Sequence, residues 1–159
     1  MALTKLNNQS LSAVTSAGLP SGSTLQVVSQ EFNVQEYTGS SSWGDTSITA
    51  TITPLSASNK ILILVHTQAI TTSGSDHGEF GLRRSISGGS SSDVGQPLFG
   101  ANDQLGGWQT VAYNFLDSPN TTSATTYTVR YRSRTGSNYV YNGWGNGASQ
   151  VITLIEIAG

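Results

Sequence analysis

The sequence contains no cysteine, one methionine and four prolines, and only 10% of its 159 residues are charged. The absence of cysteine excludes disulfide bonds, thiolate chemistry and cysteine-based metal sites. Ordinary soluble domains carry about 25% charged residues, so this chain is depleted in charge. Its net charge of −2 argues against a nucleic-acid-binding protein, which would normally be basic. No nonpolar run approaches the roughly 20 residues of a membrane-spanning helix, so we expect no membrane partner.

Serine, threonine and glycine take the place of the missing charge, with 24 Ser, 19 Thr and 18 Gly. Threonine favours strands, whereas glycine and serine favour turns. The composition therefore predicts a β-protein, and the length predicts one domain with at most a short additional arm.

The longest run of large aliphatic residues is Ile61–Val65, within a predicted strand over residues 60–70. Because neighbouring residues of a strand point to opposite faces, the two leucines of the run face one way and its β-branched residues the other. Both faces are nonpolar, so we expect a central strand covered on both sides, in a two-layer or oligomeric body.

Shorter segments with alternating or β-rich patterns predict the other strands. They are residues 25–32 with a bend into 34–38, then 48–53, 79–85, 108–116, 125–134, 139–141 and 150–157. The Gly- and Ser-rich segment 87–107 is predicted to be a long loop, and no helix is expected. About eight strands separated by turns predict an all-β fold, an antiparallel β-sandwich, for which we prefer the jelly-roll type.

The two ends of the chain differ in character. Residues 1–23 have irregularly spaced nonpolar residues and end in a Gly- and Pro-containing turn, so we expect an extended N-terminal arm before a sandwich domain at 24–159. The closing strand 150–157 is nonpolar on both faces. Together with the charge-poor composition, which lacks the usual guards against association, this favours a homo-oligomer.

Three segments, residues 48–65, 115–129 and 152–159, resemble as a set the small virion structural proteins of tailed bacteriophages, especially those of aquatic and cyanobacterial hosts. Such proteins are described as head-decoration or tail-fibre-like proteins. The resemblance covers most of residues 25–159. It implies a homotrimeric β-sandwich on the surface of the phage particle, with no cofactor.

The resemblance leaves two functions open. In the first, the chain is a capsid decoration, or cement, protein that stabilises the head and binds the major capsid protein through its arm. The arm residues expected to make this contact are Leu3, Leu6, Leu11, Val14 and Leu19. In the second, it is a tail-fibre or tip module that contacts tail proteins and binds a host receptor or surface glycan. An arm followed at once by one domain, without a shaft or repeat, favours decoration.

Few residues suggest catalysis or metal binding. His77 lies between Asp76 and Glu79 and could bind a cation, but a polar hairpin turn is the preferred interpretation because no second set of ligands is present. His66 is expected in the core or at a subunit interface. The glycine-rich segment 143–147 precedes a strand rather than a helix, which favours a loop over a phosphate site. Acidic residues are scattered singly and no nucleophile motif is present, so we expect neither an enzyme nor a metal site.

Three arginines alternate along one predicted strand, which places Arg130, Arg132 and Arg134 on the same face. Like charges in a row repel each other unless anions face them. The strip could therefore dock onto carboxylates of a capsid protein or sister subunit. Equally, acidic residues of the same chain could lie beside it on a solvated face.

The tryptophans Trp43, Trp108 and Trp144 lie in or beside polar loops, as do Tyr139 and Tyr141. Exposed aromatic side chains there could stack on sugar rings of a receptor. The preferred alternative is that they cap the ends of the sandwich or fill a subunit interface. An exposed patch of several of them would favour the receptor-binding function.

Overall fold

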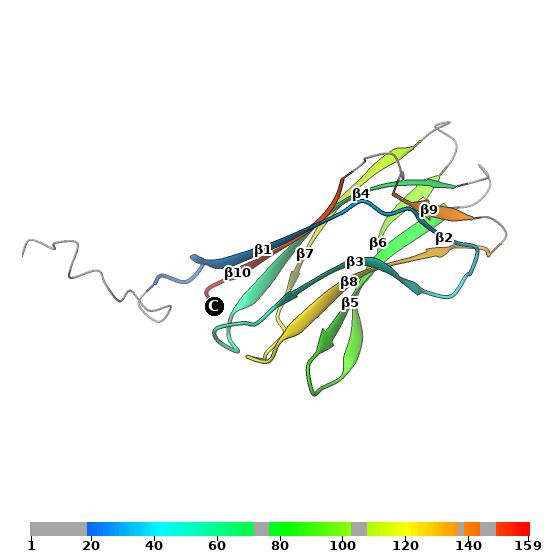
Figure 1. The fold of residues 1–159 in the computed structure, drawn as a ribbon. Helices are drawn as coiled ribbons and strands as arrows, with labels where there is room; N and C mark the ends of the chain where they lie inside the picture. The colour runs from blue at the N-terminus through cyan, green and yellow to red at the C-terminus, as the bar shows by residue number, and fades with distance from the viewer. Residues whose placement is uncertain (1–18, 72–76, 103–107, 137–138, 144–148) are drawn as a thin grey trace, which may run out of the picture.

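The computed structural model describes residues 19–71, 77–102, 108–136, 139–143 and 149–159, with only the backbone described for 96–102 (Figure 1). These residues form ten strands with antiparallel pairing throughout. The strands are β1 (Thr24–Phe32), β2 (Glu36–Thr38), β3 (Gly44–Ile52), β4 (Lys60–Thr71), β5 (His77–Ile86), β6 (Ser91–Asn102), β7 (Gln109–Asp117), β8 (Thr125–Ser133), β9 (Val140–Asn142) and β10 (Gln150–Ile157). No helix among the described residues is long and nonpolar enough to span a membrane.

The strands form two sheets that pack face to face. Sheet A has the order β1-β10-β4-β9-β2, and β7 also pairs with β4. Sheet B has the order β3-β8-β5-β6. The all-β, antiparallel sandwich predicted from the sequence is therefore confirmed, whereas the jelly-roll topology and the N-terminal arm stay predictions. The first strand begins at the expected start of the sandwich, residue 24.

The core lies between the sheets and follows the period-two alternation of the sequence. On β3, for example, Ile48, Ala50 and Ile52 are buried while Thr51 is exposed. The largest nonpolar side chains that are fully buried come from both sheets: Ile48, Ile52, Ile61, Ile63, Phe80, Leu82, Val111, Tyr127, Ile152 and Leu154.

Strand β4 is central, as predicted, since it pairs with β10 and β9 along one edge and with β7 along the other. Its inner residues Ile61, Ile63 and Val65 are buried. The expectation that its outer face is also covered is wrong for the single chain. Leu64 is 38% exposed and His66 is exposed, because sheet B covers only the inner face of sheet A.

The predicted loop over 87–107 is wrong, because strand β6 occupies residues 91–102. It forms a hairpin with β5 through a short turn in which Gly88 has φ of 72°, a conformation that favours glycine. Pro97 is tolerated because β6 is an edge strand of sheet B, where one side needs no ladder hydrogen bonds. The pairing shifts register twice between Phe80 and Arg83, which accommodates this irregular partner.

Replacement of Ile63 by alanine tests the orientation of β4. Ile63 has no exposed surface, so we expect Ile63→Ala to lower the free energy of unfolding by about 2–5 kcal/mol. Leu64→Ala, on the exposed face, should cost clearly less at protein concentrations where the chain is monomeric. Urea unfolding of both variants measures the difference. A larger cost for Leu64→Ala would contradict the assigned faces.

Candidate functional site

A continuous row of nonpolar side chains crosses the outer face of sheet A. Val27 lies opposite Ile155, Ile155 opposite Leu62, and Leu62 opposite Leu116, so the row runs through β1, β10, β4 and β7 in register. Val27 is 57% exposed and Leu116 is 50% exposed. Leu64, one row further along β4, adds to it. We call Val27, Leu62, Leu116 and Ile155 the apolar row.

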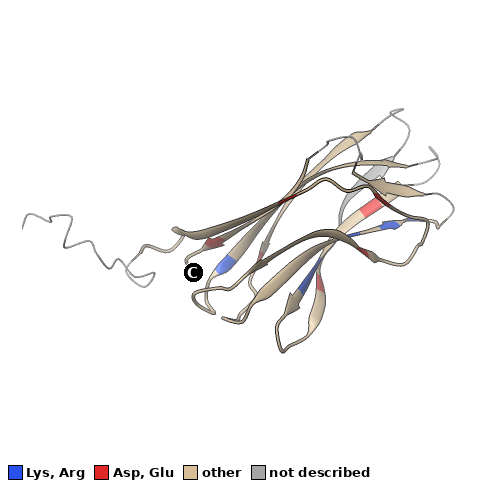
Figure 2. Cartoon of the chain, in the orientation of Figure 1, with Lys and Arg blue, Asp and Glu red and all other residues tan. Residues whose placement is uncertain are grey.

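Charged residues are sparse on the strands of sheet A (Figure 2), and the charged residue of β4 is Lys60, two residues from Leu62. The next register row along the strands is neutral and consists of Ser29, Thr153, Leu64 and Asn114. Large contiguous nonpolar surfaces of this kind are typical of sites of association with other proteins.

An aromatic cluster lies toward the other end of the same sheet and consists of Tyr37, Trp108, Tyr139 and Tyr141. The ring centroids of Tyr37 and Tyr139 are 5.4 Å apart with planes at 82°, and those of Tyr37 and Tyr141 are 5.5 Å apart with planes at 37°. Trp108 contacts Tyr141 edge-on at 6.5 Å. Tyr37 and Tyr139 are 62% and 51% exposed, so the cluster is a surface feature.

Strand pairing brings the cluster together from distant parts of the chain. Tyr37 of β2 lies opposite Tyr141 of β9, which in turn lies opposite Ile70 of β4. A Cβ atom on Gly39 would lie 3.2 Å from the Tyr139 ring, so the absence of a side chain there lets the ring approach the backbone. Tyr37 was not among the residues singled out from the sequence, because nothing local connects it to residues a hundred positions away.

The outer face of sheet B holds the predicted arginine strip, surrounded by carboxylates of the same chain. Arg130 donates to Asp45 at 3.0 Å and to Asp93 at 2.7 Å. Arg132 donates to Glu79 at 2.7 Å. Arg134 is the exception, since it is mostly exposed and lies 3.9 Å from Glu79. This geometry is what the same-chain alternative describes, and docking through the strip remains a prediction.

The three tryptophans proposed as receptor-facing residues lie in different settings. Trp43 lies beneath the guanidinium of Arg132, whose carbon is 4.7 Å from the ring centroid, and its carbonyl accepts a hydrogen bond from Arg130. Trp108 belongs to the aromatic cluster. Trp144 lies outside the described residues. Of the two tryptophans that the structure describes, Trp108 is the one that contacts another aromatic side chain of the cluster, Tyr141.

A buried polar group connects the two sheets. Asp117 at the end of β7 accepts two hydrogen bonds of 2.9 Å from Arg84 of β5 and one of 2.7 Å from the hydroxyl of Tyr127 on β8. The carboxylate is thereby paired with a cation and hydrogen-bonded, as a buried charge must be. Burial, reinforced by the Asp117 carboxylate, raises the pKa of Tyr127 above its ordinary value. Arg84 and Tyr127 thus both bond to the Asp117 carboxylate, which indicates a structural role for this group.

A second buried carboxylate, that of Glu156, lies at the end of the sandwich where β1 begins and β10 ends. Glu156 has no exposed surface and accepts hydrogen bonds from the side chains of Gln26 and Asn59 and from the backbone of Leu55. Asn59 in turn accepts a hydrogen bond from the Gly159 backbone at 3.2 Å. These bonds hold β1, the β3–β4 turn and the end of β10 together.

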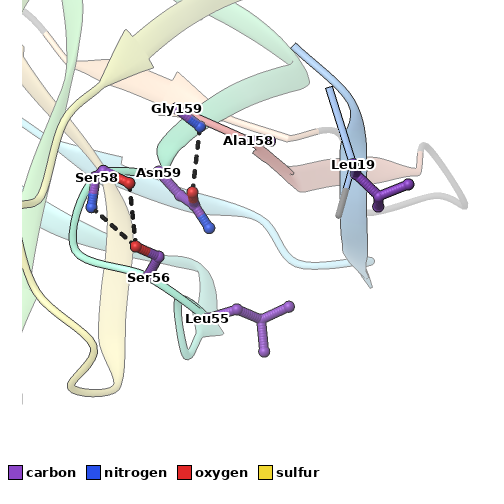
Figure 3. Close-up of a pocket in the computed structure, with 7 residues that line it drawn as sticks. All are labelled: Leu19, Leu55, Ser56, Ser58, Asn59, Ala158 and Gly159. Atoms are coloured by element: carbon purple, nitrogen blue, oxygen red, sulfur yellow. Dashed lines mark hydrogen bonds between the residues drawn. The ribbon is translucent and has the colours of Figure 1, made fainter. Parts of the chain in front are cut away.

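A pocket of about 420 Å³ opens beside this carboxylate (Figure 3). Its lining consists of Leu19, Leu55, Ser56, Ser58, Asn59, Ala158 and Gly159. The polar groups there bond to each other, as in the contacts of Asn59 with Gly159 and of Ser56 with Ser58. None of the lining side chains is an acid, a base or an activated nucleophile. Of the predicted arm residues only Leu19 is described, 37% exposed at this pocket, and Leu3, Leu6, Leu11 and Val14 lie outside the described residues.

Within the part of the chain that the structure describes, neither histidine belongs to a cluster of metal-binding side chains. Among the described residues no group of three or more His, Asp or Glu side chains could hold a metal ion. His77 begins β5 rather than a turn, and the adjacent Gly78 is required there because a Cβ atom would lie 2.6 Å from Val140. Asp76 and most of the glycine-rich segment 143–147 lie outside the described residues.

Comparison of the chain with known protein families and with curated proteins finds no family model and no curated protein that matches it. Function is therefore inferred from the apolar row and the aromatic cluster of sheet A, together with the resemblance of three sequence segments to phage virion proteins.

Stability at alkaline pH tests the burial of the tyrosines. Burial, with a smaller contribution from Glu36, raises the pKa of Tyr131 to about 12. The folded chain keeps this phenol neutral while the unfolded chain ionises it near pH 10, so its contribution is fully present below pH 10 and is lost as the pH rises through 12. We expect Tyr131→Phe to make the alkaline loss of stability shallower, by up to about 1.4 kcal/mol per pH unit.

The control for this measurement is Tyr37→Phe, because Tyr37 is exposed. Denaturant unfolding between pH 9 and 12 should give this control the slope of the unchanged protein. The same slope in Tyr131→Phe would contradict the burial of Tyr131.

Proposed function

We propose that this chain is a structural protein on the surface of a tailed-phage particle, a capsid decoration protein whose sandwich associates with further copies of itself through the outer face of sheet A. The observation that carries the proposal is the apolar row, which joins four strands in register and is left uncovered by its own chain. The resemblance of the sequence segments to phage virion proteins supplies the biological setting.

The dimensions of the face suit an interface between subunits. Four strands about 4.8 Å apart and eight residues long cover roughly 500 Å² in plan, before the relief of the side chains is added. A stable interface buries about 800 Å² from each partner. The face therefore approaches the required area, and its nonpolar residues would contribute about 25 cal/mol for each Å² removed from water.

Decoration requires many modest contacts repeated over a shell rather than one tight site. A compact sandwich with a largely uncharged face is suited to this because such contacts depend little on salt. We propose the homotrimer as the assembly and the arm, residues 1–23, as the contact with the major capsid protein. In this role the protein opposes the pressure of the packaged DNA mechanically, and no chemical step is involved.

Receptor binding at a phage tail is the second candidate function. The aromatic cluster favours it, because exposed aromatic side chains can bind a receptor, whereas capsid decoration does not require them. The two candidates share the fold and the particle and differ in where on the particle the chain resides.

Immunogold electron microscopy of intact particles tests the location. The antibody is raised against the recombinant chain and applied to particles of the phage that encodes it. We expect label spread over the head, which is where decoration proteins bind. Label confined to the tail would contradict decoration and support the second candidate, and unlabelled particles would contradict both.

The association face is tested by Leu116→Asp. A carboxylate in the middle of a nonpolar interface loses its hydration, so we expect the variant to be monomeric at concentrations where the unchanged chain is a trimer, as measured by light scattering after gel filtration. Because Leu116 is half exposed, the fold should survive, which circular dichroism verifies.

The matched control is Leu55→Asp, at a residue that is 58% exposed but lies in the β3–β4 turn, outside the apolar row. This variant should remain a trimer. A monomeric unchanged chain, or a trimeric Leu116→Asp variant, would exclude the apolar row as the subunit interface.

A further inference from the structure

The aromatic cluster has a shape and chemistry that the decoration role leaves unused. We propose that it binds a neutral saccharide, with a sugar ring stacked on Tyr37 and bordered by Tyr139. This inference names the ligand class for the receptor-binding candidate and depends on it only for the biological setting, since binding is a property of the domain itself.

The spacing of the rings decides how a ligand can be bound. Centroid separations of 5.4, 5.5 and 6.5 Å are contact distances, so the rings fill the space between themselves and leave no cage for a small cation. A ligand must therefore lie on top of the rings. Tyr37 and Tyr141, with planes at 37°, form a shallow platform, and Tyr139 stands nearly perpendicular to Tyr37 beside it.

Backbone pairing between strands fixes the positions of the tyrosines that form the platform. Tyr37 and Tyr141 are paired across β2 and β9, and β2 is further fixed because the Glu36 carboxylate accepts hydrogen bonds from the backbone and hydroxyl of Ser47. Tyr139 packs against the bare backbone of Gly39. Little conformational entropy is lost when a ligand binds to rings that are already ordered.

Charge selects a neutral ligand over a nucleic acid, although bases also stack on aromatic rings. Single-stranded nucleic acids need cations beside the stacking platform to bind their phosphates. On the described outer face of β4 the cation is Lys60. It is ten residues from Ile70, which pairs with Tyr141, and therefore lies about 33 Å from the cluster along the strand. Arg130 and Arg132 of sheet B are paired with carboxylates, and the exposed Arg134 lies 3.9 Å from the Glu79 carboxylate.

The chemistry of a sugar ring matches that of the aromatic cluster. Its C–H faces are nonpolar and stack on aromatic rings, and its hydroxyls hydrogen-bond at the periphery. Tyrosine hydroxyls can serve that second purpose, because a tyrosine has a nonpolar ring and a polar tip. The exposed Ser40 follows Gly39 in the chain, and the Gly39 backbone contacts the Tyr139 ring.

The test is binding of the full chain to an array of neutral and acidic oligosaccharides, followed by titration of the best neutral one, with intrinsic tryptophan fluorescence and NMR as readouts. We expect saturable binding of at least one neutral oligosaccharide, and at least tenfold weaker binding by Tyr37→Ala and by Tyr139→Ala. Trp43→Ala, an aromatic residue outside the cluster, and Leu55→Ala should bind as the unchanged chain does.

The other outcomes overturn the inference. Absence of binding to every neutral saccharide, stronger binding of an oligothymidylate, or binding unaffected by Tyr37→Ala each exclude the proposed site. Loss of the trimer in Tyr37→Ala, with saccharide binding absent from the unchanged chain, would assign the cluster to a subunit interface instead. Saccharide binding combined with label on the head would retain the site and remove only the tail location.

Discussion

The packing of sheet A on sheet B through the inner face of β4 is the constraint on which the rest of the structure depends. Ile61, Ile63 and Val65 point into the core, while β10 and β7 pair along both edges of the strand. A shift of one residue in register would turn these side chains outward. Once this register is set, the positions of Leu62, Leu64 and Ile70 on the outer face follow without further choice.

The outer faces of the two sheets differ in their side chains: those of sheet B form ion pairs, whereas the apolar row of sheet A is exposed to water. Sheet B carries arginines, and those of the β8 strip and β5 lie beside carboxylates from neighbouring strands, as Arg130 does between Asp45 and Asp93. Sheet A has no comparable network along the apolar row, and its exposed leucines and valine contact water in the single chain. Exposed ion pairs contribute little to stability, but they keep a surface soluble. This difference is why sheet A, rather than sheet B, is the face on which we place association.

The sequence predicted those elements whose cause is local. The closing strand has the predicted bounds 150–157, and the alternation of β3 is as expected, because both follow from side-chain periodicity. Strand β6 was missed because glycine, serine and Pro97 are typical of loops, and only pairing with β5 makes that segment a strand. The exposure of Leu64 could not be predicted, since a nonpolar face looks the same in the sequence whether its own chain or another covers it. The aromatic cluster depends on strand order, which periodicity does not contain.

The positions of the two surfaces on sheet A decide whether both can act in one particle. Leu62 and Ile70 are eight residues apart on the same face of β4, which is about 26 Å along the strand. In Figure 1 the ends of β1 and β10 lie toward the side of the C-terminus, and β2 and β9 lie toward the opposite end. Subunits that associate around the apolar row can therefore leave the aromatic cluster accessible at the far end. One face then serves two partners because their sites are separated along the strands, and binding at one does not require release at the other.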